Sequence, residues 1–235
     1  VRDERLMLPL LKKADVIMPL ACLVGAPLCA QKPIEARSIN LDAILMLLKN
    51  ASKSQKFISP TTNSGYGVGQ AGVFCTEETP MNPISLYGVL KVELEKALLG
   101  AGAISLRLAT VCGVSPRMRL DLLVNDFTYR AVVDRFVVLF EAHFKRNYIH
   151  VRDVARAFCH ALDHFDLMRG QPYNIGLSDA NLSKMELCLE IQKQVPDFTI
   201  MEAPVGKDPD QRNYIVSNDK IEATGFRPQV SIQRA

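Results

Sequence analysis

Tyr87 and Lys91 stand four residues apart in a stretch whose apolar residues recur at helical spacing, over roughly 85–99. We expect a helix there, with Ser85 as its N-cap and Gly100 as its C-cap glycine. Residues four apart lie on one helix face, and a nearby cation lowers the pKa of a tyrosine because it favours the phenolate. The pair could therefore move a proton. The alternative is an interface aromatic beside a solvated charge, since this spacing also arises easily by chance.

The composition indicates an ordinary globular protein. The chain has 235 residues, 48% hydrophobic and 23% charged, so we expect a large core in one or two packed domains. A net charge of +3 with interspersed signs argues against a nucleic-acid or membrane partner. The six cysteines form no C-x-x-C pair, which is typical of reduced thiols in a cytoplasmic protein. Pro19 and Pro27 break the apolar run 16–30, so we expect neither a spanning helix nor a signal peptide there.

Strands and helices alternate along the first half of the chain. Apolar runs and helical periodicity predict, in order, a strand over 15–21, a helix over 38–49, a strand over 56–59, the helix over 85–99 and a strand over 104–108. Such alternation indicates βαβ units and therefore an α/β fold with a parallel sheet covered on both faces. Ligands of such sheets bind beyond the carboxyl ends of the strands. The loops expected at those ends are 19–25, 61–67 and 110–113.

The second half begins with a change of character near Pro116. A helical segment carries Arg117, Arg119 and Arg130, for which a solvated face is the default interpretation. The elements expected after it are strands over 136–140 and 145–150, a helix over 151–168, a strand over 172–176, a helix over 183–194 that opens with a capping box, a strand over 198–203 and a polar loop over 205–212.

Several short motifs, taken in order, point to one family. They are Asp15-Val16-Ile17 running to Leu20-Ala21, Asn40, Thr62 ahead of Tyr66-Gly67, Tyr87 with Lys91, Arg107, the segment 146–154, Arg212-Asn213-Tyr214 with 217–220, and Gly225-Phe226-Arg227-Pro228. In this pattern the chain resembles the extended short-chain dehydrogenase/reductase family, specifically its NAD-dependent nucleotide-sugar epimerases and dehydratases. The likeness spans essentially the whole chain.

This resemblance implies a Rossmann-like parallel sheet with a smaller C-terminal α/β substrate-binding domain. The dinucleotide-binding domain would comprise 1–115 and 146–176, and the interleaved nucleotide-sugar domain 116–145 and 177–235. The family's glycine-rich turn, which holds the cofactor pyrophosphate at a helix N-terminus, is absent from the sequence. We therefore expect the first β-α-β-α to be missing, by fragmentation or natural truncation, and NAD to be held poorly.

The resemblance also assigns roles near the cofactor. Tyr87 would be the acid/base, and Lys91 would activate it and bind the nicotinamide ribose. Thr62 would orient the reacting oxygen, although a turn residue at a strand end is the alternative. Asn40 would bridge helix backbone and water near the lysine, or simply be a polar residue at a helix start. Backbone contacts to NAD, with NADP as the alternative, would come from Leu20, Ala21 and Cys22.

The substrate implied by the resemblance is a nucleotide-sugar. Arg146 and Arg212 would bind its diphosphate, because guanidinium and phosphate pair bidentately, and Asn125 would contact the nucleotide or the diphosphate. The strand-end residues Thr62, Asn63 and Ser64 would contact the sugar. Asn63 and Ser64 stand where dehydratases of the family carry Asp-Glu. Neither of them titrates usefully, so the sequence favours an epimerase over a dehydratase.

Two alternative functions stay open at this point. The chain could be an NADP-dependent keto-sugar reductase, or a truncated, non-catalytic Rossmann-like protein. The resemblance implies a homodimer built from a four-helix bundle, but the apolar residues of 38–49 are equally compatible with packing on the sheet: Leu41, Ile44, Leu45 and Leu48. His160 and His164 could suit a metal by their spacing, yet no third ligand is in view and we expect none to bind.

Overall fold

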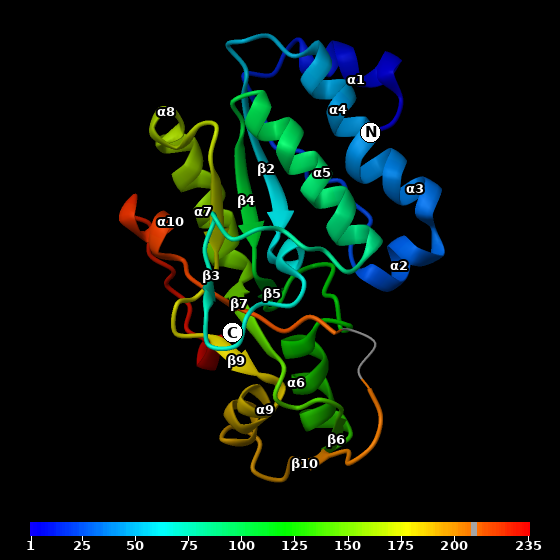
Figure 1. Ribbon diagram of the computed structural model, residues 1–235, viewed down its shortest axis with the longest axis vertical. Helices are drawn as coiled ribbons and strands as arrows, with labels where there is room; N and C mark the ends of the chain where they lie inside the picture. Colours follow the sequence, from blue (N-terminus) through cyan, green and yellow to red (C-terminus); the bar gives the residue numbers. More distant parts are fainter. Residues whose placement is uncertain (208–210) are drawn as a thin grey trace. The chain divides into compact units, whose positions relative to one another are not determined.

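The computed structural model describes residues 1–207 and 211–235, so residues 208–210 of the predicted loop 205–212 lie outside the described residues. The chain divides into two compact units (Figure 1). The first comprises 1–67, 79–107 and 158–173, and the second comprises 68–78, 108–157 and 174–235.

The first unit is organised on a sheet in the strand order β1-β2-β4-β8. These strands are β1 (Val16–Ile17), β2 (Lys56–Thr62), β4 (Ile104–Leu108) and β8 (Pro172–Ile175). β1 runs parallel to β2, with Val16 opposite Lys56, which agrees with the predicted α/β class. The strand expected over 15–21 is wrong in its length, because Pro19 has no N–H to donate to a ladder. β2 is longer than expected and includes Thr61 and Thr62, whose β-branched side chains suit a strand.

This unit also contains helices, one of which, α7, begins in the second unit. They are α1 (Glu4–Leu11), α2 (Ala26–Gln31), α3 (Pro33–Arg37), a π-helix (Ser38–Asp42), α4 (Ala43–Asn50), α5 (Leu86–Gly100), α7 (Val151–Asp163) and α8 (Phe165–Met168). The helix predicted over 38–49 therefore begins as a π turn that continues α3. The helix predicted over 151–168 is interrupted at His164, whose backbone is not helical. Figure 1 shows α4 and α5 running side by side.

The core of the first unit lies between α4, α5 and the sheet. Leu41 and Ile44 are 0% and 3% exposed, and they pack in one cluster with Leu90 and Leu94 of α5. The apolar side chains of 38–49 thus pack largely within the same chain. These contacts agree with packing inside the chain, one of the two alternatives given for these residues.

The ends of α5 match the sequence only in part. Ser85 is the N-cap, and its hydroxyl accepts a hydrogen bond from the Gly88 N–H at 3.2 Å. The prediction of Gly100 as C-cap glycine is wrong, because the helix runs through Gly100 and its C-cap is Ala101. The left-handed glycine comes two residues later, at Gly102, with φ of 74°.

The second unit contains three small sheets. β5 (Thr110–Cys112), β7 (Lys145–His150) and β9 (Asn181–Ser183) form one; β6 (Phe136–Leu139) pairs with β10 (Thr199–Glu202), and β3 (Phe74–Cys75) with β11 (Ile215–Val216). Its further helices are α6 (Leu123–Val133), α9 (Lys184–Gln192), α10 (Asp219–Ala223) and a 3₁₀ turn (Ile232–Arg234). Arg117 and Arg119 precede α6, so the predicted helical segment starts later than expected.

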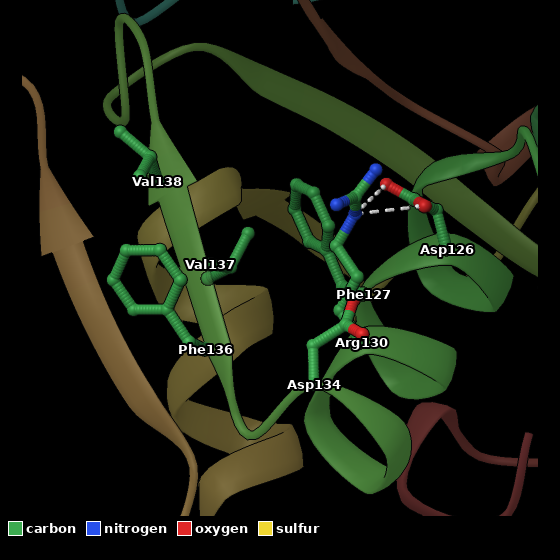
Figure 2. Close-up of a pocket in the computed structure, with 7 residues that line it drawn as sticks. All are labelled: Asp126, Phe127, Arg130, Asp134, Phe136, Val137 and Val138. Atoms are coloured by element: carbon green, nitrogen blue, oxygen red, sulfur yellow. Dashed lines mark hydrogen bonds and ion pairs between the residues drawn. The ribbon is translucent and has the colours of Figure 1, made fainter.

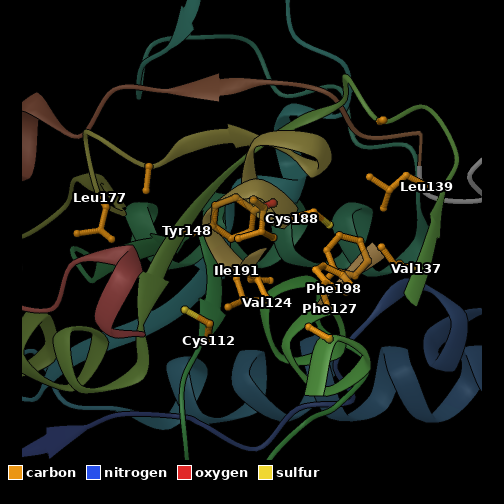
Figure 3. Packing of buried hydrophobic residues seen from close by; sticks show 14 residues of the cluster. Cys112, Val124, Phe127, Val137, Leu139, Tyr148, Leu177, Cys188, Ile191 and Phe198 are labelled. Atoms are coloured by element: carbon orange, nitrogen blue, oxygen red, sulfur yellow. The ribbon is translucent and has the colours of Figure 1, made fainter. Parts of the chain in front are cut away.

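A buried cluster between α6, α9 and β7 forms the core of this unit (Figure 3). It includes Phe127, Tyr148 and Phe198, which are between 0% and 7% exposed. Burial raises the pKa of the Cys112 and Cys188 thiols to about 12, so these two cysteines are inert core residues. Among the described helices, none combines the length and the apolar character needed to cross a membrane.

The predicted capping box at the start of α9 is confirmed. Ser183 N donates to Glu186 Oε2 at 2.7 Å, and Glu186 N donates to Ser183 Oγ at 3.1 Å. The hydrogen bond from the Ser183 backbone is the main reason why the pKa of Glu186 lies below its ordinary value. A carboxylate with a lowered pKa stabilises the fold above its unfolded pKa, and that contribution is lost as the pH falls through the folded pKa.

We therefore expect Glu186→Gln to lower the free energy of unfolding at pH 7 by a few tenths of a kcal/mol, since the side chain is partly exposed. The two proteins should become equally stable near pH 3, where the wild-type carboxyl is also neutral. Urea unfolding at both pH values checks this, with Glu202→Gln on β10 as the control. A difference that persists unchanged at pH 3 would contradict the electrostatic explanation.

Candidate active site

Tyr87 and Lys91 lie on the first two turns of α5. Tyr87 is half-buried against the core cluster of the first unit. Lys91 is only 3% exposed, and its Nζ donates a hydrogen bond to the Pro60 carbonyl at 3.0 Å. Lys91 is therefore not the solvated charge that the alternative interpretation required. A buried ammonium needs such a partner, because burying an unpaired charge is costly.

Thr62 ends β2 and opens a 3₁₀ turn (Asn63–Tyr66). Its Oγ1 accepts a hydrogen bond from Ser64 N at 3.1 Å and donates to Ser64 Oγ at 3.0 Å. Thr62 is 9% exposed. The hydroxyl pair at this strand end is thus held in a fixed arrangement by the turn that follows it.

The first turn of α5 lies directly against this turn, because Gly88 has no side chain. A methyl group at Gly88 would lie 2.9 Å from Pro83 Cβ and 3.4 Å from the Ser64 carbonyl oxygen. Since Gly88 follows Tyr87, the structure brings the tyrosine-bearing turn to the Thr62–Ser64 segment. Thr62, Ser64, Tyr87 and Lys91 thus belong to one local group in the first unit.

Asn63 lies within the same turn but is fully enclosed. Its side chain is 0% exposed, and neither amide atom has a hydrogen-bond partner in the part of the chain that the structure describes. Buried amides are normally satisfied. The predicted contact of Asn63 with a substrate stays a prediction.

The loop predicted to meet the cofactor is held by Asn40. Asn40 Oδ1 accepts from Leu23 N, and Asn40 Nδ2 donates to Leu23 O, both at 2.8 Å. The thiols of Cys22 and Cys29 each donate to that same Leu23 oxygen at 3.3 Å. Asn40 sits in the π-helix, an element often found at functional sites. It is therefore a loop-holding residue, rather than a helix-start residue facing solvent.

This arrangement fits a dinucleotide. Leu20, at 65% exposure, and Ala21 are exposed residues of this loop. Burial raises the pKa of Cys29 in α2, and the positive charge of Lys91 opposes that shift. An ammonium has three N–H donors, and within the described residues Lys91 uses one, toward Pro60. Donors thus remain for a ribose.

Removing the Asn40 side chain tests this support. We expect Asn40→Ala to lower the free energy of unfolding by about 1–3 kcal/mol, because the partly buried Leu23 backbone groups lose their partners. Affinity for the cofactor should fall with it, measured by titration into the apo protein. Asn50→Ala, which removes an exposed amide bound to the Met46 carbonyl, should change neither quantity. Equal cofactor affinity for both variants would contradict the role of Asn40.

The predicted substrate residues Arg146, Asn125 and Arg212 all lie in the second unit. Arg146 is 1% exposed, with its guanidinium 5.6 Å from the centre of the Tyr214 ring and Nη1 donating to the Lys145 carbonyl at 2.9 Å. Asn125 accepts from Gly113 N at 3.2 Å and donates to the Arg119 carbonyl at 2.9 Å. Arg212 is half-buried. Asn125 thus holds the loop before α6, and the phosphate contacts of both arginines stay predictions.

A surface hollow in the second unit lies between α6 and β6 (Figure 2). Arg130 Nε donates to both carboxylate oxygens of Asp126 at 2.9 and 3.0 Å. The apolar side of the hollow comes from Phe136, Val137 and Val138. It contains none of the predicted site residues.

His160 lies on α7, and His164 directly follows the end of that helix. The rings of His160 and His164 stack with centroids 4.2 Å apart. No cluster of three or more metal-ligating side chains occurs in residues 1–207 and 211–235.

One buried ion pair was not expected from the sequence, although Arg107 is one of the motif residues. Glu95 of α5 and Arg107 of β4 form a buried ion pair next to Thr61, with Nη2 and Oε1 2.7 Å apart. The available signal was a carboxylate four residues after Lys91, flanked by Leu94 and Leu98 at positions that the helix buries. A charge at such a position requires a buried partner.

Comparison with known proteins bears on the family of the chain. A family model described as the NAD dependent epimerase/dehydratase family matches residues 1–176. A UDP-glucose 4-epimerase of Lactobacillus helveticus is 25% identical over 93% of this chain and 73% of its own length. An uncharacterised UDP-glucose epimerase of Bacillus subtilis is 28% identical, and the chain spans only 54% of its length.

Solved structures share the fold. The UDP-glucose 4-epimerase of Thermotoga maritima, solved with UDP-glucose, has a TM-score of 0.85 at 25% identity, over 99% of this chain and 79% of the other. That of Thermus thermophilus, solved with NAD, has a TM-score of 0.83 at 24% identity with the same coverage. These likenesses confirm the Rossmann-like α/β fold and the family resemblance found in the sequence.

Proposed function

The chain belongs to the NAD-dependent epimerase/dehydratase family, and on that premise we propose that it epimerises a nucleotide-sugar through a transient keto-sugar. The observation that carries the proposal is the buried Lys91 ammonium, bound to the strand end that bears Thr62. Tyr87 lies one helical turn away from it. A tyrosine, a lysine and a strand-end hydroxyl grouped in this way can exchange the proton of a sugar hydroxyl.

The proton is handled by the chain's own residues. The Tyr87 phenolate takes the proton of the sugar hydroxyl as the carbon–oxygen double bond forms, and it returns the proton when that bond is reduced. The Lys91 charge favours the phenolate, and the Thr62 hydroxyl orients the reacting oxygen. NAD, the cofactor for which the family is named, would supply the acceptance and return of hydride when bound.

Asn63 and Ser64 favour an epimerase over a dehydratase. Elimination of water needs a further acid and base, and neither an amide nor a serine hydroxyl titrates near neutral pH. Both residues are buried in the turn after Thr62. Inversion at a carbinol carbon needs no such further acid and base: beside the acceptance and return of hydride that bound NAD would supply, it needs only the proton relay already described and a keto-sugar that rotates before the hydride returns to its other face.

For the second unit we propose a role in substrate binding, with Arg146 and Arg212 on the diphosphate and Asn125 near the nucleotide. The support is chemical, because a guanidinium matches phosphate in charge and geometry.

We place the enzyme in the cytoplasm, where the six free cysteines would stay reduced.

We also propose a homodimer through α4 and α5, which sedimentation at micromolar concentration tests. The face left for a partner includes Val89, which is 45% exposed.

The full-length protein provides the test of activity. It should release NAD on denaturation, and it should convert a member of a nucleotide-sugar panel to its epimer, reaching the same ratio from either side. Thr62→Val should slow this conversion while retaining the fold, as monitored by circular dichroism. If the wild-type protein releases no NAD and converts no nucleotide-sugar even with NAD added, the proposal fails.

A further inference from the structure

The carboxylate of Glu95 is the centre of a buried polar network on α5. Glu95 is 5% exposed and lies one turn beyond Lys91. Its Oε2 accepts hydrogen bonds from Ser105 Oγ at 2.7 Å and Thr61 Oγ1 at 3.1 Å. Arg107 adds Nε at 3.0 Å and Nη2 at 2.7 Å, so that the pair is bidentate. This network fastens α5 to β2 one residue before Thr62.

Arg107 extends the network to the far end of the 3₁₀ turn (Asn63–Tyr66) that follows Thr62. Its Nη1 donates to the Tyr66 hydroxyl at 2.9 Å, and its guanidinium carbon lies 5.5 Å from the centre of the Tyr66 ring. Burial lowers the pKa of Arg107, but its bonds to Glu95 and Tyr66 outweigh burial and raise it. Tyr66 is the last residue of the turn that Thr62 opens.

Thr62 thus lies between two residues that the network holds. Thr61, on one side, is bound to Glu95; Tyr66, on the other, is bound through Arg107 to the same carboxylate. Glu95 shares α5 with Tyr87 and Lys91, so the carboxylate links the tyrosine-bearing helix to both ends of the threonine-bearing turn. We propose that Glu95, Arg107 and Tyr66 act as positioning residues that set Tyr87 against Thr62.

A purely stabilising role would not need this chemistry. Taking two charges out of water costs so much that well-packed apolar residues often stabilise a core as well as, or better than, a buried ion pair. Apolar contacts are non-directional, whereas a bidentate guanidinium fixes distance and angle. Proton transfer is sensitive to such placement, and a misplacement of about 1 Å can cost about a hundredfold in rate.

This inference rests on the proposed function, so its test has one arm that needs no turnover. Tyr66→Phe in the full-length protein keeps the ring and removes one hydroxyl. We expect kcat to fall about tenfold or more with KM and bound NAD unchanged. We also expect the Ser64 amide, which donates to Thr62, to exchange its hydrogen at least about tenfold faster, while the Leu94 amide of α5 keeps its protection. Glu95→Gln should act in the same direction, and Tyr173→Phe on β8 is the matched control.

The outcomes separate the two proposals. Wild-type kcat in Tyr66→Phe, or unchanged Ser64 exchange, overturns the positioning role while leaving the epimerase assignment intact. If the wild-type protein shows no turnover, the epimerase assignment and the catalytic part of this inference fail together, even where Ser64 exchange is faster in Tyr66→Phe than in the wild type. Equal losses of kcat in Tyr66→Phe and Tyr173→Phe overturn it as well, because the effect would then follow from any buried hydroxyl.

Discussion

Tyr87→Phe should lower kcat by about 10²–10⁴-fold, the range typical of losing a general acid/base, while NAD stays bound. Phenylalanine keeps the ring that packs against the core cluster and removes only the atom that carries the proton. KM for the nucleotide-sugar should change little, because the phenol contributes mainly as bonds form and break. Single-turnover and steady-state assays on the full-length protein give both quantities.

Tyr129→Phe is the matched control for this change. Tyr129 lies on α6 and is 47% exposed, so its hydroxyl is lost at the surface of the other unit, and kcat should be unchanged. Turnover retained in Tyr87→Phe would remove the phenol from the mechanism and, with it, the main reason for an acid/base assignment on α5.

Arg107→Met should lower the free energy of unfolding by about 3–5 kcal/mol at pH 7, the usual cost of breaking one side of a buried ion pair. Both partners are enclosed, with side chains 6% and 7% exposed. The variant leaves the Glu95 carboxylate buried without its cation, and it leaves the Tyr66 hydroxyl without the guanidinium. Urea unfolding followed by circular dichroism measures the loss.

The same substitution at the surface supplies the comparison. Arg130 also pairs with a carboxylate, its Nε donating to both oxygens of Asp126 at 2.9 and 3.0 Å, but it is 47% exposed, and exposed pairs contribute only about 0–1 kcal/mol. Arg130→Met should therefore cost at most about 1 kcal/mol. Similar losses at the two positions would show that burial does not set the value of the Glu95–Arg107 pair.

The sequence predicted those elements whose signals are local. The helix around Tyr87 begins at its predicted N-cap because the Ser85 hydroxyl satisfies a free N–H of the first turn. The capping box of Ser183 and Glu186 likewise needs no partner outside its own helix. Alternation of strands and helices sufficed for the α/β class, since βαβ units have few alternatives.

Features decided by tertiary contacts escaped prediction. The π turn around Asn40 leaves no mark in apolar periodicity, because the same residues also fit a regular helix. Glu95 looks like an ordinary helix residue until Arg107, twelve residues later, is placed beside it. The bonds of the Asn125 amide to the Gly113 N–H and the Arg119 carbonyl were likewise not readable from the sequence. For Glu95 and Asn125 the deciding partners lie outside the local pattern.

The hydrogen bond between Lys91 and Pro60 also accounts for the early end of β1. Lys56 N donates to Asp15 O, and alternate residues of a strand face the same neighbour, so the Pro60 carbonyl points to the β1 side. Continuing the register of Val16 with Lys56 would give that carbonyl the amide of Ala21 as its donor. The Lys91 ammonium donates to the Pro60 carbonyl instead. The main chain at Ala21 therefore has no rung with β2 at this position.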